Sequence, residues 1–187
     1  MGKEQAKKKR VSKGEWLDMA LEILTQEGIE EVRIEKLAAR LGISKSGFYW
    51  HFSDRDDLYR QLLKAWEHEM TKVITENPEI NLGPVEKRLE NIMTIISDYE
   101  LGRAEASIFV WSQRDEQVLG VMHRVNKERL GFLRGLFEEL GFEGDELDMR
   151  TQLFAVYAAN EHSFLHHLPK SKRDRLLKRR VRLLTQK

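Results

Sequence analysis

One stretch of the sequence, residues 34–52, constrains the fold more than any other. It reads IEKLAARLGISKSGFYWHF. Apolar residues recur in its first half at i, i+3, i+4 and i+7, at Ile34, Leu37, Ala38 and Leu41. This spacing predicts one apolar face of a short helix. Gly42 predicts a tight turn after that helix, because glycine adopts a left-handed backbone without steric strain.

A second short helix is expected after the turn. Ser44 is a suitable N-cap for it, and Phe48 and Phe52 are its candidates for burial. A helix, a short glycine turn and a second helix form the arrangement that places the second helix in the major groove of DNA. The alternative is a pair of short packed helices such as any all-α protein contains.

The flanking residues extend the pattern into a small helical domain. Upstream, a third amphipathic helix is expected to end at Gly28, with apolar positions at Trp16, Leu17, Ala20, Leu21 and Leu24. Ser12 and Glu15 have the spacing of a capping box at its start. Downstream, Ser53 or Asp54 is expected to cap a long helix that runs to about Glu76.

The run VRIEKLAARLGISKSGFYWHFSDRDDLYRQLL, residues 32–63, resembles the N-terminal DNA-binding domain of TetR-family transcriptional regulators. The most specific parts are FYWHF (residues 48–52) and DRDDL (residues 54–58). The resemblance in motif covers about residues 12–65. It implies an all-α protein with an N-terminal helix-turn-helix domain and a helical-bundle domain for ligand binding and dimerisation.

The resemblance also implies roles for individual residues. Lys45, Ser46 and Gly47 lie in the first turn of the second helix, where side chains reach base edges. Tyr49, His51 and Arg55 match positions that contact the DNA backbone, although many relatives carry lysine in place of this arginine. At the position of Arg33, many members have a threonine that binds a phosphate. The predicted DNA-binding residues are Arg33, Ser44, Lys45, Ser46, Gly47, Tyr49, Trp50, His51 and Arg55.

Length and composition agree with a helical protein that has a hydrophobic core. The chain has 187 residues, of which 41% are hydrophobic and 34% charged, and it has no cysteine. Disulfides and thiolate metal sites are therefore excluded. No apolar run approaches the ~18 residues of a membrane span, so a cytoplasmic protein is expected. We divide the chain into a disordered basic arm (1–11), a helix-turn-helix domain (12–60) and an effector-binding and dimerisation domain (61–187).

Charge is strongly segregated along the chain. The net charges are +1 for residues 1–60, −8 for residues 61–169 and +8 for residues 170–187. A near-neutral first segment permits DNA binding without supporting it. The basic start, MGKEQAKKKRV, is expected either to follow DNA phosphates or to act as a solubilising tail.

The second half predicts further helices over residues 85–98, 104–112, 115–140, 147–166 and 171–184. The stretch from Asn77 to Pro84 is expected to be a loop, and Gly141 and Gly144 are expected to break the chain. By resemblance, the last two helices would form a homodimer interface, where Ala155, Ala158 and Ala159 allow close approach. The alternative is that both helices pack only within one protomer. A basic group in the last helix is expected to be a solvated face, with a second nucleic-acid patch as the alternative; it comprises Lys178, Arg179, Arg180 and Arg182.

An apolar small-molecule effector is implied by the resemblance. A methionine-rich and aromatic set in the body is the candidate pocket lining, although such a stripe at helical spacing also fits plain core. The set comprises Trp66, Met70, Met93, Ile96, Phe109, Trp111, Met122, Phe154 and Tyr157.

Catalytic and metal-binding patterns are weak. His162 and His166 have the i, i+4 spacing of a metal pair, but no third ligand is evident nearby. The sequence has no phosphate-binding glycine loop and no nucleophile elbow, so neither an enzyme nor a cofactor is expected. We therefore predict a dimeric regulator, most simply a repressor, that a small molecule releases from a palindromic operator. The competing interpretation is a helical adaptor or small-ligand-binding protein that does not bind DNA specifically; an all-α enzyme ranks third.

Overall fold

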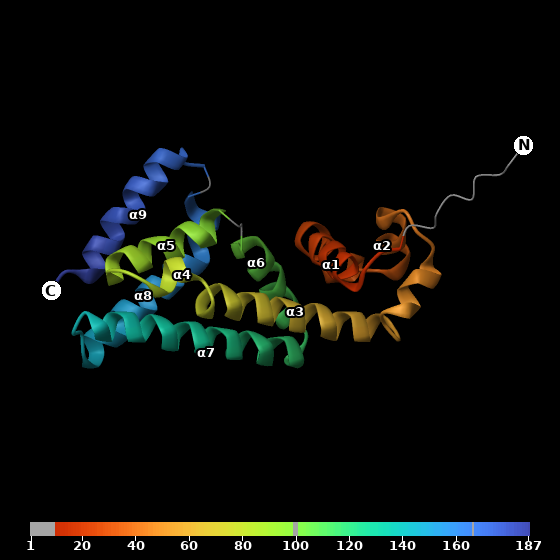
Figure 1. Cartoon of the computed structure of the whole chain (residues 1–187), viewed down its shortest axis with the longest axis horizontal. Coiled ribbons are helices and arrows are strands. Elements are labelled where there is room, and N and C mark those ends of the chain that lie inside the picture. Colours follow the sequence, from red (N-terminus) through yellow and green to blue (C-terminus); the bar gives the residue numbers. More distant parts are fainter. Residues whose placement is uncertain (1–9, 99–100, 166) are drawn as a thin grey trace, which may run out of the picture. The chain divides into compact units, whose positions relative to one another are not determined.

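The computed structural model describes residues 10–98, 101–165 and 167–187. It is helical in all the elements assigned within these residues (Figure 1). The chain divides into two compact units, the first ending at Trp66 and the second running from Glu67 to Lys187. The long helix α3 (Arg55–Thr75) belongs to both, because the division falls within it.

The first unit contains α1 (Lys13–Glu27), η1 (Ile29–Glu31), α2 (Ile34–Leu41), η2 (Lys45–Trp50) and the start of α3. The predicted capping box is confirmed: the backbone N–H of Glu15 donates to the Ser12 side chain, and the Glu15 carboxylate accepts from the Ser12 backbone N–H. Gly28 ends α1 at a φ of 95°. Both signals are local in sequence, which is why pattern alone locates this helix.

The turn between α2 and η2 also follows the sequence signal. Gly42 has a φ of 70°, in the left-handed region where other residues are strained. Its N–H and that of Ile43 donate to carbonyls in the last turn of α2, so the end of the helix is satisfied. At the start of α3, the Asp57 N–H donates to the Asp54 side chain at 2.7 Å. Of the two candidates that the sequence offered, Ser53 and Asp54, Asp54 is therefore the N-cap of α3.

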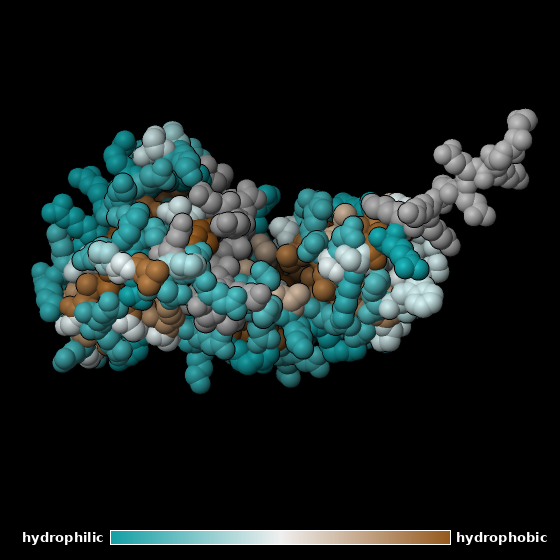
Figure 2. Space-filling view, in the orientation of Figure 1, coloured by the Kyte–Doolittle hydropathy of each residue, from teal (hydrophilic) through white to brown (hydrophobic). Residues whose placement is uncertain are grey.

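The second unit contains the rest of the helices of the described chain. These are α4 (Pro78–Asn81), α5 (Val85–Asp98), α6 (Leu101–Ser112), α7 (Glu116–Glu139), α8 (Gly144–Leu165) and α9 (Lys170–Thr185). α7 packs against α6 and α8, and α5 packs against α9 (Figure 1). Hydrophilic side chains cover much of the visible surface (Figure 2).

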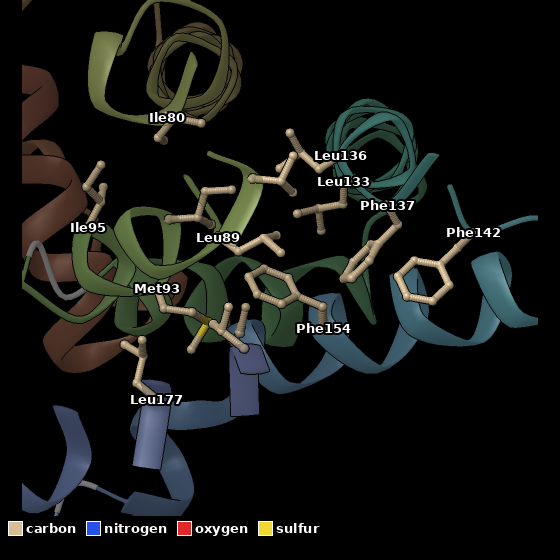
Figure 3. Close-up of a cluster of buried hydrophobic side chains, with 14 of the residues drawn as sticks. Ile80, Leu89, Met93, Ile95, Leu133, Leu136, Phe137, Phe142, Phe154 and Leu177 are labelled. Carbon is tan, nitrogen blue, oxygen red and sulfur yellow. The ribbon is translucent and has the colours of Figure 1, made fainter. Parts of the chain in front are cut away.

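The core of this unit is a cluster of buried aliphatic and aromatic side chains from α4, α5, α7, α8 and α9 (Figure 3). The Phe137 ring of α7 meets the Phe154 ring of α8 edge-on, with 6.2 Å between centroids. Leu89 of α5 is fully buried in the same cluster. None of the helices in the described part of the chain combines the length and hydrophobicity that a membrane span requires.

Two local expectations in this unit are wrong. The stretch from Asn77 to Pro84 is not entirely loop, since α4 forms one helical turn within it. Proline is favourable in a first helical turn because its missing N–H has no partner there. Gly144 does not break a helix; with a φ of 56° it is the first residue of α8.

Candidate DNA-binding site

The reading element η2 is held by aromatic packing on its inner side. Phe48 is fully buried, its ring edge-on to Trp16 of α1 at 5.5 Å and tilted against Phe52 at 5.0 Å. Gly47 faces this packing, because a Cβ at that position would lie 3.4 Å from the Ile43 side chain and 3.9 Å from Trp16. Burial of large rings at three positions fixes how η2 sits on α1 and α2.

η2 is a 3-10 helix, where the sequence predicts only an unspecified second helix. Ser44 occupies the N-cap position, but its side chain makes no capping hydrogen bond. The Ser44 hydroxyl instead lies 2.7 Å from the Ser46 hydroxyl. The tight 3-10 turn is closed by the Gly47 N–H, which donates to the Ser44 carbonyl at 3.1 Å.

The outer side of η2 is open to solvent. Trp50 is 86% exposed and Tyr49 is 62% exposed, which is unusual for such large rings. Lys45 and Ser46 are exposed in the first turn of the same element. The structure therefore leaves a cation, a hydroxyl and two aromatic groups of η2 open to solvent, and groups of these kinds contact phosphates and base edges.

Two predicted DNA-binding cations already have carboxylate partners. Lys45 Nζ donates to Glu35 Oε1 at 2.7 Å, and this hydrogen bond lowers the pKa of the Glu35 carboxyl. Arg33 donates to Glu31 at 2.6 Å and to the Glu30 carbonyl at 3.0 Å. Such exposed pairs are weak enough for a phosphate to replace the carboxylate.

The remaining predicted cation and the histidine differ from these. The Arg55 guanidinium lies over the Tyr59 ring, 5.5 Å from its centroid, and the structure gives it no carboxylate partner. His51 Nε2 lies 3.0 Å from the carbonyl oxygen of Val11. Val11 is buried, so His51 connects the end of η2 to the segment that leads into α1.

A structural residue that the sequence analysis did not single out supports this surface. The Tyr59 hydroxyl of α3 lies within donor distance of the Ile29 carbonyl at 3.0 Å and the Val32 carbonyl at 3.1 Å. These carbonyls flank η1, the connection between α1 and α2. Burial raises the pKa of the Tyr59 phenol. No sequence pattern signals this contact, because it joins residues about thirty positions apart.

Three members of the predicted apolar pocket set border one cavity of the second unit. A cavity of about 430 Å³ lies among α5, α8 and α9. Of the predicted lining residues, only Met93, Phe154 and Tyr157 border it; the others are Trp66, Met70, Ile96, Phe109, Trp111 and Met122. Phe109 is 54% exposed, whereas Trp66 is buried and belongs to the first unit.

The cavity has one polar side. The Arg180 guanidinium lies 3.7 Å from the Tyr157 ring centroid and pairs with Glu161 at 3.1 Å. Burial lowers the pKa of Arg180 to about 10 and raises the pKa of Glu161, an effect that the charge of Arg173 opposes. Arg180 is therefore not part of the solvated face that the sequence analysis predicts for the last helix.

No metal centre emerges from the described side chains. These residues contain no cluster of three or more His, Asp or Glu that would hold an ion. The side chains of His162 and His166, the pair noted in the sequence, lie outside the described part of the structure.

Comparison with known proteins finds relatives of the first unit. Residues 17–62 match the family model for bacterial regulatory proteins of the tetR family. The HTH-type transcriptional regulator AcrR of Shigella flexneri is 33% identical over 51 residues, which are 27% of this chain and 22% of AcrR. The aligned part thus spans about a fifth of that relative's length.

Solved structures match almost the whole chain. A transcriptional regulator from Rhodococcus sp. Rha1 has a TM-score of 0.72 at 15% identity, with 93% of this chain and 96% of that chain covered. The regulator FadR of Bacillus subtilis, solved in complex with stearoyl-CoA, has a TM-score of 0.68 at 17% identity, with 93% and 98% covered. At these identities the likeness concerns the fold.

Proposed function

Because residues 17–62 match the tetR family of bacterial regulatory proteins, we propose that this chain is a member of that family and acts as a dimeric transcriptional repressor, which releases a palindromic operator when it binds a small molecule. The observation that carries the DNA-binding role is the exposed surface of η2, in which Lys45, Ser46, Tyr49 and Trp50 surround a buried Phe48. The same domain arrangement is the one that docks a recognition helix in the major groove.

Within this proposal, the residues of η2 divide between bases and backbone. Lys45 and Ser46 lie in its first turn and would reach base edges. Gly47 faces Ile43 and Trp16, so its missing side chain serves the inner packing rather than close approach to DNA. Tyr49, His51 and Arg55 would contact phosphates, with Arg33 on the other side of the turn. Trp50 would pack against the sugar-phosphate backbone or a thymine methyl.

Dimerisation through α8 and α9 is supported by an exposed apolar stripe. Met149, Leu153 and Val156 follow one another at helical spacing on α8 and are 51%, 53% and 64% exposed. Leu183 of α9 is 70% exposed, and with Leu153 and Val156 it borders the 430 Å³ cavity. Apolar side chains this exposed are typical of an interface between subunits. A second copy would cover the open side of the cavity.

An effector would act by shifting a conformational equilibrium. A ligand that binds one arrangement of the second unit more tightly favours that arrangement by its differential binding energy. The division between the units falls inside α3, so a change in the second unit has a continuous helix through which to reach the first. FadR is a relative in fold with a bound acyl-CoA, which makes apolar acyl compounds reasonable first probes.

The first experiment is selection of bound DNA from a random duplex library at near-physiological salt. Enrichment of a palindrome is the expected result, since a two-fold dimer reads two half-sites. Tyr49→Phe and His51→Ala should weaken binding to all sequences, whereas Lys45→Ala should also change the selected motif. Lys127→Ala, which removes an exposed charge from α7, is the control.

The competing function is a helical adaptor or ligand-binding protein without specific DNA binding. It would be favoured if the folded, dimeric protein enriched no motif with or without acyl probes. If a motif were enriched but all three η2 variants bound it like the parent, the assignment of the reading surface to η2 would be wrong.

A further inference from the structure

The last helix, α9, carries a continuous stripe of cations on one side. Five exposed basic residues recur there at spacings of three or four residues, which is about one helical turn. They are Lys172, Arg175, Lys178, Arg179 and Arg182. At 3.6 residues per turn these positions cover about a third of the helix circumference. We call this surface the α9 basic stripe. The visible surface over α9 is largely hydrophilic (Figure 2).

The stripe lacks internal counter-charges. Among the described side chains none forms an ion pair with these five residues, and Asp174 is the only carboxylate in α9. Elsewhere in the described chain, ion pairing of exposed and half-buried cations is common. Arg40 pairs with Glu22 and Glu27, and Arg129 pairs with Glu105. Isolated cations such as Arg55 also lack a carboxylate partner among the described residues, but α9 is where five such cations recur on one side of a helix.

The spacing of these cations is unfavourable for the stability of α9 itself. Arg175 with Arg179, and Lys178 with Arg182, are like charges four residues apart, which destabilises a helix. Only Arg182 lies in the last turn, where a cation is favourable near the helix C-terminus. Asp174, four residues before Lys178, offsets part of this repulsion, and an external anion would relieve the rest.

The stripe is separate from the faces of α9 that are already occupied. Leu177 and Val181 are buried in the core, and Arg180, Leu183 and Leu184 border the cavity. Helical geometry places the stripe opposite the core residues Leu177 and Val181. Leu183, four residues after Arg179, borders the stripe, so a dimer formed through the apolar stripe of α8 and Leu183 would leave Arg175, Lys178 and Arg182 accessible, with Arg179 at its margin.

We propose that the α9 basic stripe binds the phosphate backbone of duplex nucleic acid without reading its sequence. Three of its five residues are arginines, whose planar guanidinium groups match phosphate oxygens in a bidentate way. A duplex presents one negative charge per about 1.7 Å of its axis, a density that suits cations repeated at each helical turn. An anionic membrane fits less well, because helices that bind membranes also insert an apolar face, and here that face is in the core.

This proposal goes beyond the reading function of η2 and does not depend on it. The test uses the full chain with Lys45→Ala and Tyr49→Phe as background, so that binding through η2 is weakened. The probe is a fluorescent 30-base-pair duplex of scrambled sequence, measured by anisotropy at a series of NaCl concentrations. Three proteins are compared: the background, the same protein with Arg175→Gln, Arg179→Gln and Arg182→Gln, and a charge-matched control with Arg124→Gln, Lys127→Gln and Arg134→Gln in α7.

Loss of three phosphate contacts should reduce the slope of log affinity against log salt by about 2 to 3, and should weaken binding at least tenfold at 0.1 M NaCl. The α7 control should keep both values. Lysine at the same three α9 positions should restore most of the slope, which separates loss of charge from loss of folding.

Three results would overturn the proposal. One is an unchanged slope in the α9 glutamine variant, and another is an equal reduction in the α7 control. The third is unchanged duplex binding combined with lost binding to phosphatidylserine vesicles, which would indicate a membrane surface instead. Because the duplex contains no operator, none of these outcomes depends on whether η2 recognises a sequence.

Discussion

Glu35 is expected to restrain DNA binding through Lys45. The two side chains meet at 2.7 Å, with 57% of the lysine and 64% of the glutamate side chain exposed. A phosphate that approaches Lys45 must displace this carboxylate. Glu35→Gln removes the charge but keeps the size of the side chain, so we expect the variant to bind DNA more tightly than the parent.

The exposure of the Lys45–Glu35 pair determines how much Glu35→Gln should tighten DNA binding. An exposed ion pair changes the equilibrium constant for pairing by a factor of about 1.4 to 5 at room temperature. Relief of repulsion between Glu35 and nearby phosphates adds a similar small factor, which salt screens over about 8 Å. Glu35→Gln should therefore tighten binding to the selected operator about 2- to 10-fold at 0.15 M salt, with the gain shrinking as salt rises.

The assay is a double-mutant cycle on operator affinity with Lys45→Ala. The increase caused by Glu35→Gln should be mostly lost in the Lys45→Ala background, because the cation that it frees is gone. Glu128→Gln, an exposed glutamate of α7, is the matched control for a change in overall charge. The reasoning would be refuted by an equal gain with or without Lys45, or by no gain at all.

Two further predictions concern the scaffold. Tyr59→Phe should lower the free energy of unfolding by about 1–2 kcal/mol, because the Val32 carbonyl loses the tyrosine donor and the Ile29 carbonyl keeps only the Val32 N–H. Since the pKa of Tyr59 is raised, its contribution is present below the ordinary tyrosine pKa near 10 and is lost as pH rises through the folded value; thermal denaturation between pH 8 and 11 should show this loss in the parent and not in the variant. Val156→Asp should convert a dimer to a monomer in sedimentation experiments, whereas Asn126→Asp at an exposed polar position of α7 should not; a dimeric Val156→Asp protein would place the interface elsewhere.

Signals that act within a few residues predicted the fold well. The helix over residues 85–98 has the predicted bounds, and Asp115 caps α7 by accepting from the N–H groups of Gln117 and Val118. The turn at Gly42 follows from the backbone conformation that glycine alone adopts easily. In each case the residues that determine the structure are neighbours in sequence, so a pattern is sufficient.

Contacts between distant residues account for what the sequence did not show. The pairing of Lys45 with Glu35 depends on how the turn brings η2 back to the start of α2. Residue type alone did not show which apolar residues of the second unit are buried. Met122 and Trp111 are buried, whereas Phe109 is exposed. Which of them line a cavity depends on helix rotation and crossing, which hydrophobic spacing constrains only to a face.

The distribution of paired and unpaired cations suggests a division of labour in DNA binding. On the reading surface, Lys45 and Arg33 are paired with carboxylates. A DNA phosphate that replaces these carboxylates therefore adds little binding energy unless the DNA also makes the other contacts of η2. Such competition penalises non-specific contact more than specific contact, because only the correct sequence supplies the additional interactions. The α9 basic stripe has no such carboxylates, and would therefore attract any duplex. A chain with both surfaces would be concentrated on DNA by α9 and selective through η2, so Glu35→Gln and the α9 glutamine variant should change specificity in opposite directions.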